Sequence, residues 1–218
     1  MDRRERAPDP EEAWRLALAS LQARIWTALP GIVDTVGNNG QTVDVQPTIL
    51  GGQRETDGTY TPVTMPILPN CVVVWQGGGG VTGTFPIKKG DECVVVFASR
   101  CIDGWWKEGG VQDQLEPRMH NLTDGFAIVG LRSLPRNFVV DTNSAQIRSD
   151  DGSTVIGLNP TTQVVTISAP GGINLNGVTI DSSGNLHSPA TITGATDVIA
   201  DTKSGKTHTH NEIGRAHV

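Results

Sequence analysis

The last eighty residues of the chain contain no aromatic side chain. All five Trp, all four Phe and the single Tyr lie at or before Phe138. Each aromatic side chain buries about 150–250 Å², and small domains are already marginally stable, so a monomeric domain of this length would normally need such anchors. Residues 139–218 are therefore not expected to fold as a single chain.

Long apolar segments and excess basic charge are also missing. No run of about eighteen apolar residues occurs, and the charged residues 1–6 are not followed by an apolar segment. This argues against a membrane-spanning helix and a signal peptide, and we expect synthesis in the cytoplasm. The formal net charge is −6 and the pI about 5.3, so nucleic acid is not an expected partner.

Cysteine is scarce, and its spacing lacks the C-x-x-C pattern of zinc sites. The chain has Cys71, Cys93 and Cys101, an odd number that fits a reducing compartment during synthesis. These three side chains are expected to act as small core residues.

Local signatures of catalysis are absent as well. The sequence has no G-x-S-x-G elbow and no H-E-x-x-H, and we expect neither an enzyme nor a small-molecule substrate. His120 could be a general base backed by Asp113 or Asp124, but the favoured interpretation is a structural hydrogen-bonding residue at the edge of a barrel. His187 is expected to be a polar strand or turn residue.

What is present begins with an N-terminal segment, residues 1–29, that contains one predicted helix at about 10–28. Trp14, Leu18, Leu21 and Ile25 are spaced by four, three and four residues, so they form one apolar stripe. The favoured interpretation is that this stripe packs on the chain's own next domain. The alternatives are a short coiled coil or a contact with a neighbouring protein.

Residues 30–138 are predicted to form a small barrel of OB type. Two strands at 32–36 and 43–45 flank Asn38-Asn39-Gly40, which suits a tight hairpin turn. Further β-branched runs lie at 71–75, 93–97 and 126–129, and residues 77–80 are expected to be a flexible loop.

Residues 139–207 consist of short β-rich runs separated by turn signals every eight to eleven residues or so. The expected strands are 145–148, 153–156, 163–168, 172–175, 178–181 and 191–193. This pattern is typical of β-solenoids, and an intertwined trimer would let three chains share one aliphatic core. The predicted fold class is therefore all-β: a helix, an OB-type barrel and a trimeric β-helix or β-prism needle.

The chain ends in an apex segment, residues 208–218, that carries His208-Thr209-His210. Alternate residues of a strand point to one side, so the two imidazoles would lie together. Three chains on a three-fold axis would supply six imidazoles, a number that suits an octahedral transition metal and not tetrahedral zinc. The competing interpretation of this short motif is a solvated polar tail.

Several motifs resemble those of the central spike proteins of contractile-tailed bacteriophages. They are 43–47 (VDVQP), 62–66 (PVTMP), 85–91 (FPIKKGD), 94–100 (VVVFASR), 102–105 (IDGW), 118–126 (RMHNLTDGF) and 203–210 (KSGKTHTH). The resemblance implies an OB-fold domain that joins the baseplate hub protein and a trimeric β-helix. It also implies one iron ion per trimer, bound at the tip by His208 and His210 of each chain.

By this resemblance, the expected function is a structural spike at the distal tip of the tail baseplate of a virion, which pierces the bacterial outer membrane when the sheath contracts. A rival of another class is a receptor- or carbohydrate-binding trimeric fibre that presents Trp105, Trp106 or Tyr60 to sugars. A metal-dependent enzyme is a third alternative, but six imidazoles would leave no open coordination position.

Overall fold

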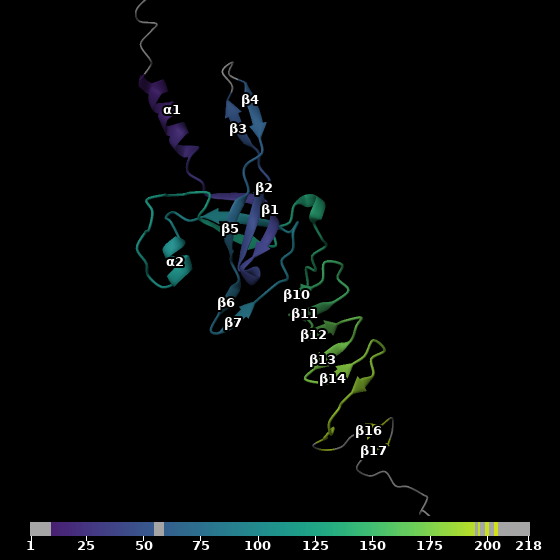
Figure 1. The fold of residues 1–218 in the computed structure, drawn as a ribbon. Coiled ribbons are helices and arrows are strands. Elements are labelled where there is room, and N and C mark those ends of the chain that lie inside the picture. The colour runs from purple at the N-terminus through teal and green to yellow at the C-terminus, as the bar shows by residue number, and fades with distance from the viewer. Residues whose placement is uncertain (1–9, 55–58, 195, 197–198, 201–202, 205–218) are drawn as a thin grey trace, which may run out of the picture. The chain divides into compact units, whose positions relative to one another are not determined.

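The structure is a computed structural model that describes residues 10–54, 59–194, 196, 199–200 and 203–204. The chain divides into two compact units, Met1–Asn137 and Phe138–Val218, and each is described here by itself. Figure 1 labels most of their helices and strands. No helix in the described part of the chain is long and apolar enough to cross a membrane.

The N-terminal helix α1 spans Pro10–Gln22 and is shorter than predicted. It cannot continue to residue 28 because Trp26 packs against the barrel core and the carbonyl of Thr27 accepts a hydrogen bond from the Phe97 amide. The apolar stripe is exposed, with Trp14 at 71%. The structure therefore does not support the favoured prediction that the stripe packs on the chain's own barrel.

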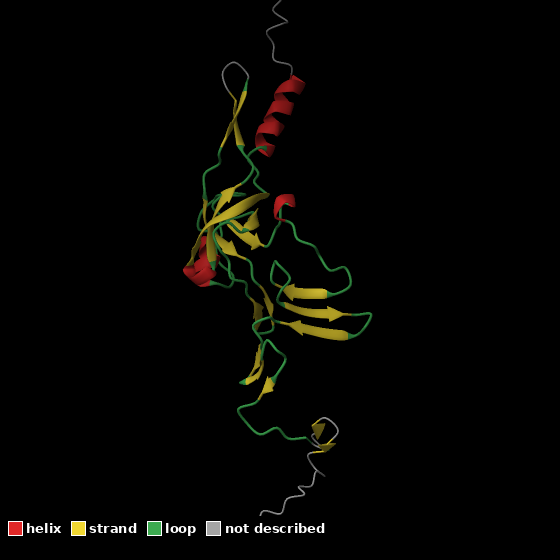
Figure 2. Cartoon of the chain, turned by 90° about the vertical axis from the view of Figure 1, so that its right-hand side faces the viewer, coloured by secondary structure: helices red, strands yellow, loops and turns green. Residues whose placement is uncertain are grey.

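Five strands of the first unit close into a small barrel (Figures 1 and 2). The strands are β1 (Ala28–Gly37), β2 (Thr42–Pro47), β5 (Leu68–Val73), β8 (Glu92–Phe97) and β9 (Gly125–Val129). Their order around the barrel is β1-β2-β5-β9-β8, and all pairs are antiparallel except β5 with β9. A five-stranded closed barrel confirms the predicted OB-like architecture.

The turn between β1 and β2 follows the predicted chemistry. Asn38, Asn39 and Gly40 all have positive φ angles, of 43°, 54° and 88°. Asparagine and glycine tolerate this left-handed backbone better than other residues do, which explains why this turn forms at this point in the sequence.

The barrel core consists mainly of aliphatic residues and two thiols. Val33, Val45 and Val95 are fully buried, and so is Cys93, while Cys71 is 1% exposed. Burial raises the pKa of Cys71 to about 12 and that of Cys93 to about 11, because the thiolate would lose its hydration. The prediction of small core cysteines is confirmed for these two, whereas Cys101 is only half-buried and outside the core.

Several further elements of this unit lie between or after the barrel strands in the sequence. They are the hairpins β3–β4 (Gly51–Arg54, Tyr60–Val63) and β6–β7 (Gln76–Gly78, Val81–Gly83), helix α2 (Asp103–Glu108) and the 3-10 helices η2 (Asn38–Gly40) and η3 (Leu134–Arg136). The predicted loop 77–80 was wrong in part, because β6 pairs with β7 and only Gly79-Gly80 forms the turn. The sequence did not predict α2.

The second unit contains short antiparallel strands. They are β10 (Ala145–Arg148), β11 (Val155–Asn159), β12 (Val164–Ser168), β13 (Ile173–Leu175), β14 (Val178–Ile180), β15 (Leu186–His187), β16 (Ile199–Ala200) and β17 (Lys203–Ser204). β10–β12 and β13–β15 form two three-stranded sheets in sequence order (Figure 2). The predicted strand 191–193 was wrong, since these residues have no regular structure. The trimeric β-helix stays a prediction.

Candidate functional site

His208 and His210, the predicted metal ligands, lie outside the described residues, as does the whole apex 208–218. The last described element is the antiparallel pair of β16 with β17. His187 lies on β15 opposite Thr179 and is exposed, as predicted for a polar strand residue. The tip metal site stays a prediction.

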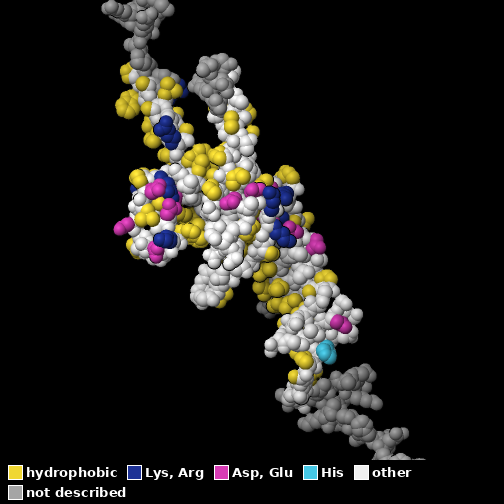
Figure 3. All heavy atoms as spheres, viewed as in Figure 1, with side chains coloured by type: hydrophobic (Ala, Val, Ile, Leu, Met, Phe, Trp, Pro, Cys, Tyr) yellow, Lys and Arg dark blue, Asp and Glu magenta, His cyan; other side chains and the backbone are white. Residues whose placement is uncertain are grey.

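One face of the sheet β10–β12 is aliphatic, and we call it the first aliphatic face. It consists of Ala145, Ile147, Ile156, Leu158, Val165 and Ile167. Ile147, Ile156 and Ile167 are register partners across the three strands, and so are Ala145, Leu158 and Val165. Hydrophobic side chains gather over these strands in Figure 3.

The first aliphatic face is uncovered in the single chain. Ile147 is 67% exposed, Leu158 57% and Ile167 48%. The opposite face of the sheet is mainly polar, although it includes Val155 and Val164. On this face Gln146 donates a hydrogen bond to Asp141, and the Arg148 guanidinium lies 5.3 Å from the centre of the Phe138 ring. The alternation of apolar and polar residues therefore gives the sheet one face that water should not contact.

The sheet β13–β15 repeats this arrangement. Its second aliphatic face consists of Ile173, Leu175, Val178, Ile180 and Leu186. Asn174, Thr179 and His187 occupy the other face. Among the described residues from 138 onward, Gly157 is the only one that is buried. The second unit therefore has no core of its own within the described part of the chain.

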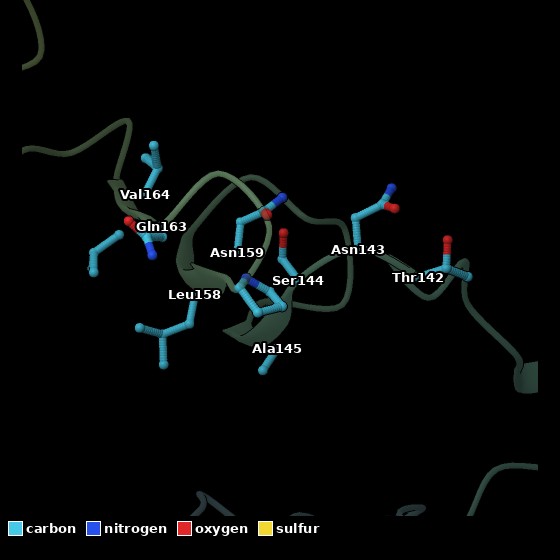
Figure 4. Close-up of a pocket in the computed structure, with 10 residues that line it drawn as sticks. Thr142, Asn143, Ser144, Ala145, Leu158, Asn159, Gln163 and Val164 are labelled. Carbon is cyan, nitrogen blue, oxygen red and sulfur yellow. The ribbon is translucent and has the colours of Figure 1, made fainter.

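A hollow of about 610 Å³ borders the first aliphatic face (Figure 4). In this view the side chains of Ala145 and Leu158 point to one side of the strands, and that of Asn159 points to the other. Ala145, Leu158 and Val165, one row of the aliphatic face, contribute to its lining. The hollow thus continues the uncovered apolar surface.

In the barrel unit, Arg118 holds together the segment between β8 and β9. Its Nε donates to Asp124 Oδ2 at 2.7 Å and its Nη2 to Oδ1 at 3.0 Å, and it also pairs with Asp103 at 2.7 Å and Glu116 at 2.9 Å. Asp124 is fully buried and also accepts the Ile102 amide at 3.0 Å. The hydrogen bond from Arg118 lowers the pKa of Asp103.

This ion-pair network positions helix α2. The Ile102 amide immediately precedes the helix, so its bond to Asp124 fixes the start of α2. Gly104 is buried, and a Cβ there would come within 3.3 Å of the Asp113 carbonyl. Trp105 packs edge-on against Phe126 of β9, with ring centres 5.7 Å apart.

The carboxylates of this network are a poor metal site. Three ligand atoms lie within 4.8 Å of one another, one each from Cys101, Asp103 and Asp124. However, the Arg118 guanidinium donates to both carboxylates and supplies the positive charge that a cation would otherwise supply.

His120 does not match its predicted role. Its Nδ1 is buried without a hydrogen-bond partner, and its backbone has a positive φ of 46°. Asp124, one of the two carboxylates that could back this imidazole, instead accepts hydrogen bonds from Arg118 and the Ile102 amide. The sequence pattern missed Arg118, although Arg118 and Asp124 both lie in the motif 118–126.

The end of the barrel unit is anchored to β8. Ser133 donates from its amide to Glu92 Oε2 at 2.6 Å and from its hydroxyl to Oε1 at 2.7 Å. These two hydrogen bonds lower the pKa of Glu92. Arg136 donates to the Gly90 carbonyl, so the segment after β9 is held close to the barrel.

The barrel unit matches a known protein-family model. The family model described as phage protein Gp138 N-terminal domain matches residues 29–130. This range covers the barrel from β1 to β9. No curated protein matches the chain. The barrel unit is therefore similar to the N-terminal domain of a phage protein, and a structural role in a phage fits this similarity.

Proposed function

We propose that this chain is the central spike of a contractile phage tail, which pierces the bacterial outer membrane when the sheath contracts. The observation that carries the proposal is the second unit, whose first aliphatic face is uncovered and whose second is exposed at Leu175 and Leu186. Three copies could bury these faces against one another around a common axis. The similarity of the barrel to a phage protein domain supports the same assignment.

A piercing spike must be stiff and end in a narrow point, and this role requires no catalysis. In a closed trimer the edge strands β10 and β12 would no longer present unpaired backbone groups, because neighbouring chains would cover them. The barrel unit has its own buried core, so it can fold independently of the needle and attach to the hub protein. The sheath supplies the mechanical work.

At the tip, the proposal assigns His208 and His210 of each chain to one iron ion. The donor set fits, because neutral imidazole is a common ligand of transition metals and six ligands suit octahedral coordination. Binding would tie together three chain ends where little apolar surface remains. Elemental analysis should find one metal ion for three chains, and the double variant His208→Ala/His210→Ala should lose it. His187→Ala is the matched control and should retain the metal.

The location is tested on intact particles. A gold-labelled tag at the C-terminus should appear in electron micrographs at the distal end of the tail axis. Light scattering should give a mass three times the 23.1 kDa of one chain. Label on side fibres would favour the receptor-binding alternative, and a monomer at micromolar concentration would contradict the trimeric needle.

A further inference from the structure

The barrel unit carries a groove of about 630 Å³ that the spike function does not use. Four segments line it: the end of β1 with the turn to β2, β5 with Trp75, β7 with residues 84–87 after it, and α2. The lining residues are Val36, Asn39, Gly40, Gln41, Val72, Val73, Trp75, Thr82, Thr84, Phe85, Pro86, Ile87 and Trp106.

The chemistry of the lining is aromatic and uncharged. Trp75, Phe85 and Trp106 supply three rings, and the residues Phe85 and Trp106 are 58% and 39% exposed. Asn39 and Gln41 are exposed and add two side-chain amides. None of the lining residues is acidic, basic or a histidine.

We propose that this groove binds an uncharged oligosaccharide. The C–H groups on the face of a sugar ring carry partial positive charge and match the negative face of an aromatic ring, while amides and hydroxyls can pair with sugar hydroxyls. A phosphate or nucleic acid would meet no cation in the lining, and the chain is acidic overall. OB folds bind oligonucleotides and oligosaccharides, and the uncharged aromatic lining of this groove favours oligosaccharides.

The place of the groove on the barrel supports this ligand class. In OB folds, the loop between the first two strands and the segment between the last two border the face that binds oligonucleotides or oligosaccharides. Here Asn39 and Gln41 belong to the first of these segments, and Trp106 belongs to the second.

Contacts within the barrel unit hold Trp106 in place without a ligand. Trp106 lies on α2, whose start is fixed by the bond from the Ile102 amide to the buried Asp124. Its ring centre lies 6.3 Å from that of Trp105, which in turn packs on Phe126. A rigid aromatic surface loses little conformational entropy on binding, so even a shallow groove can retain a ligand.

The experiment measures binding to the full-length protein by calorimetry and saturation-transfer NMR. The probes are chitotriose and cellotetraose, both uncharged, with a hyaluronan tetrasaccharide and oligo-dT as charged controls. The native protein should bind at least one uncharged probe and neither charged one. Trp106→Ala should weaken binding at least about tenfold, as expected for a central aromatic contact. Trp106→Phe should retain part of the affinity.

Trp14→Ala is the matched control, since Trp14 is an exposed tryptophan on α1 and does not line the groove. It should bind like the native protein. Near-ultraviolet circular dichroism and light scattering on the same samples separate a lost ligand from a lost fold or a lost trimer. Equal binding by Trp106→Ala, preferential binding of a charged probe, or occupation of the groove by a hub-protein segment instead of either sugar would overturn the proposal.

Discussion

Two adjacent residues of β12 test whether the first aliphatic face is an assembly surface. Ile167 lies on that face, and its neighbour Thr166 lies on the opposite, polar face. Both side chains are exposed in the single chain. Replacing either one by Asp introduces the same charge into the same strand, so any loss of strand propensity is nearly matched.

The expected effect of Ile167→Asp on the stability of a trimer follows from the exposed fraction of Ile167. Ile167 is 48% exposed, so about half of its apolar surface is still available for burial. Full burial of an isoleucine contributes about 1.5–3 kcal/mol, which leaves about 1 kcal/mol for each chain in an assembly. An unpaired buried carboxylate would cost several kcal/mol more. Three copies of Ile167→Asp should therefore destabilise a trimer by roughly 10 kcal/mol or more.

Light scattering and analytical ultracentrifugation at micromolar concentration provide the assay. The native protein and Thr166→Asp should remain trimeric, whereas Ile167→Asp should dissociate or fail to assemble. Lowering the pH toward 4 should partly restore assembly, because protonation removes the three charges. If both variants assembled equally well, the aliphatic face would not be buried between chains and the reasoning would be refuted.

Three further predictions concern the barrel unit. Arg118→Met should lower the free energy of unfolding by about 3 kcal/mol in urea titrations, because Asp124 would be left buried without its partner; no change would show that the pair is dispensable. A thiol reagent at pH 8 should modify Cys101 but not the buried Cys71 or Cys93. Because burial raises the pKa of Cys71 and Cys93, these thiols contribute their full stabilisation below the ordinary thiol pKa of 9.0, and the free energy of unfolding should fall as the pH rises toward 11–12. In an NMR titration, Ser133→Ala should raise the pKa of Glu92 only part of the way to its ordinary value, because the hydrogen bond from the backbone amide of residue 133 remains. Glu92 stabilises the fold above its ordinary pKa, and this contribution is lost as the pH falls through the lowered pKa of the folded state.

The barrel could be predicted from sequence because its signals are local. The runs at 93–97 and 126–129 are bounded by turn residues, and the strands β8 and β9 begin within one residue of these limits. Asn38-Asn39-Gly40 fixed the first hairpin through its backbone preferences. Closure of the barrel then follows from five short strands that must bury one face each.

Other features depend on contacts between distant residues and were missed. Helix α2 has only six residues, too few for an apolar periodicity, and it is held by the bond between Ile102 and Asp124, 22 positions apart. The end of α1 is set by packing of Trp26 on the barrel, so the helix stops before residue 28, the predicted end. Tertiary contacts decide such boundaries, and a single sequence does not reveal them.

The two units meet the burial requirement in different ways, and this contrast is the strongest physical argument for assembly. The barrel unit places its buried hydrophobic residues in one closed core, so its stability need not depend on protein concentration. The second unit exposes isoleucine, leucine and valine on two regular faces, while its polar residues already make turns such as that of Asp151 with Ser149 and Ser153. Ordered turns with an uncovered aliphatic face are costly for an isolated chain, because backbone entropy is lost without compensating burial. In the proposed trimer, other copies would cover these faces and make the fold of residues 138–194 favourable, so the proposal ties the folding of this unit to its assembly.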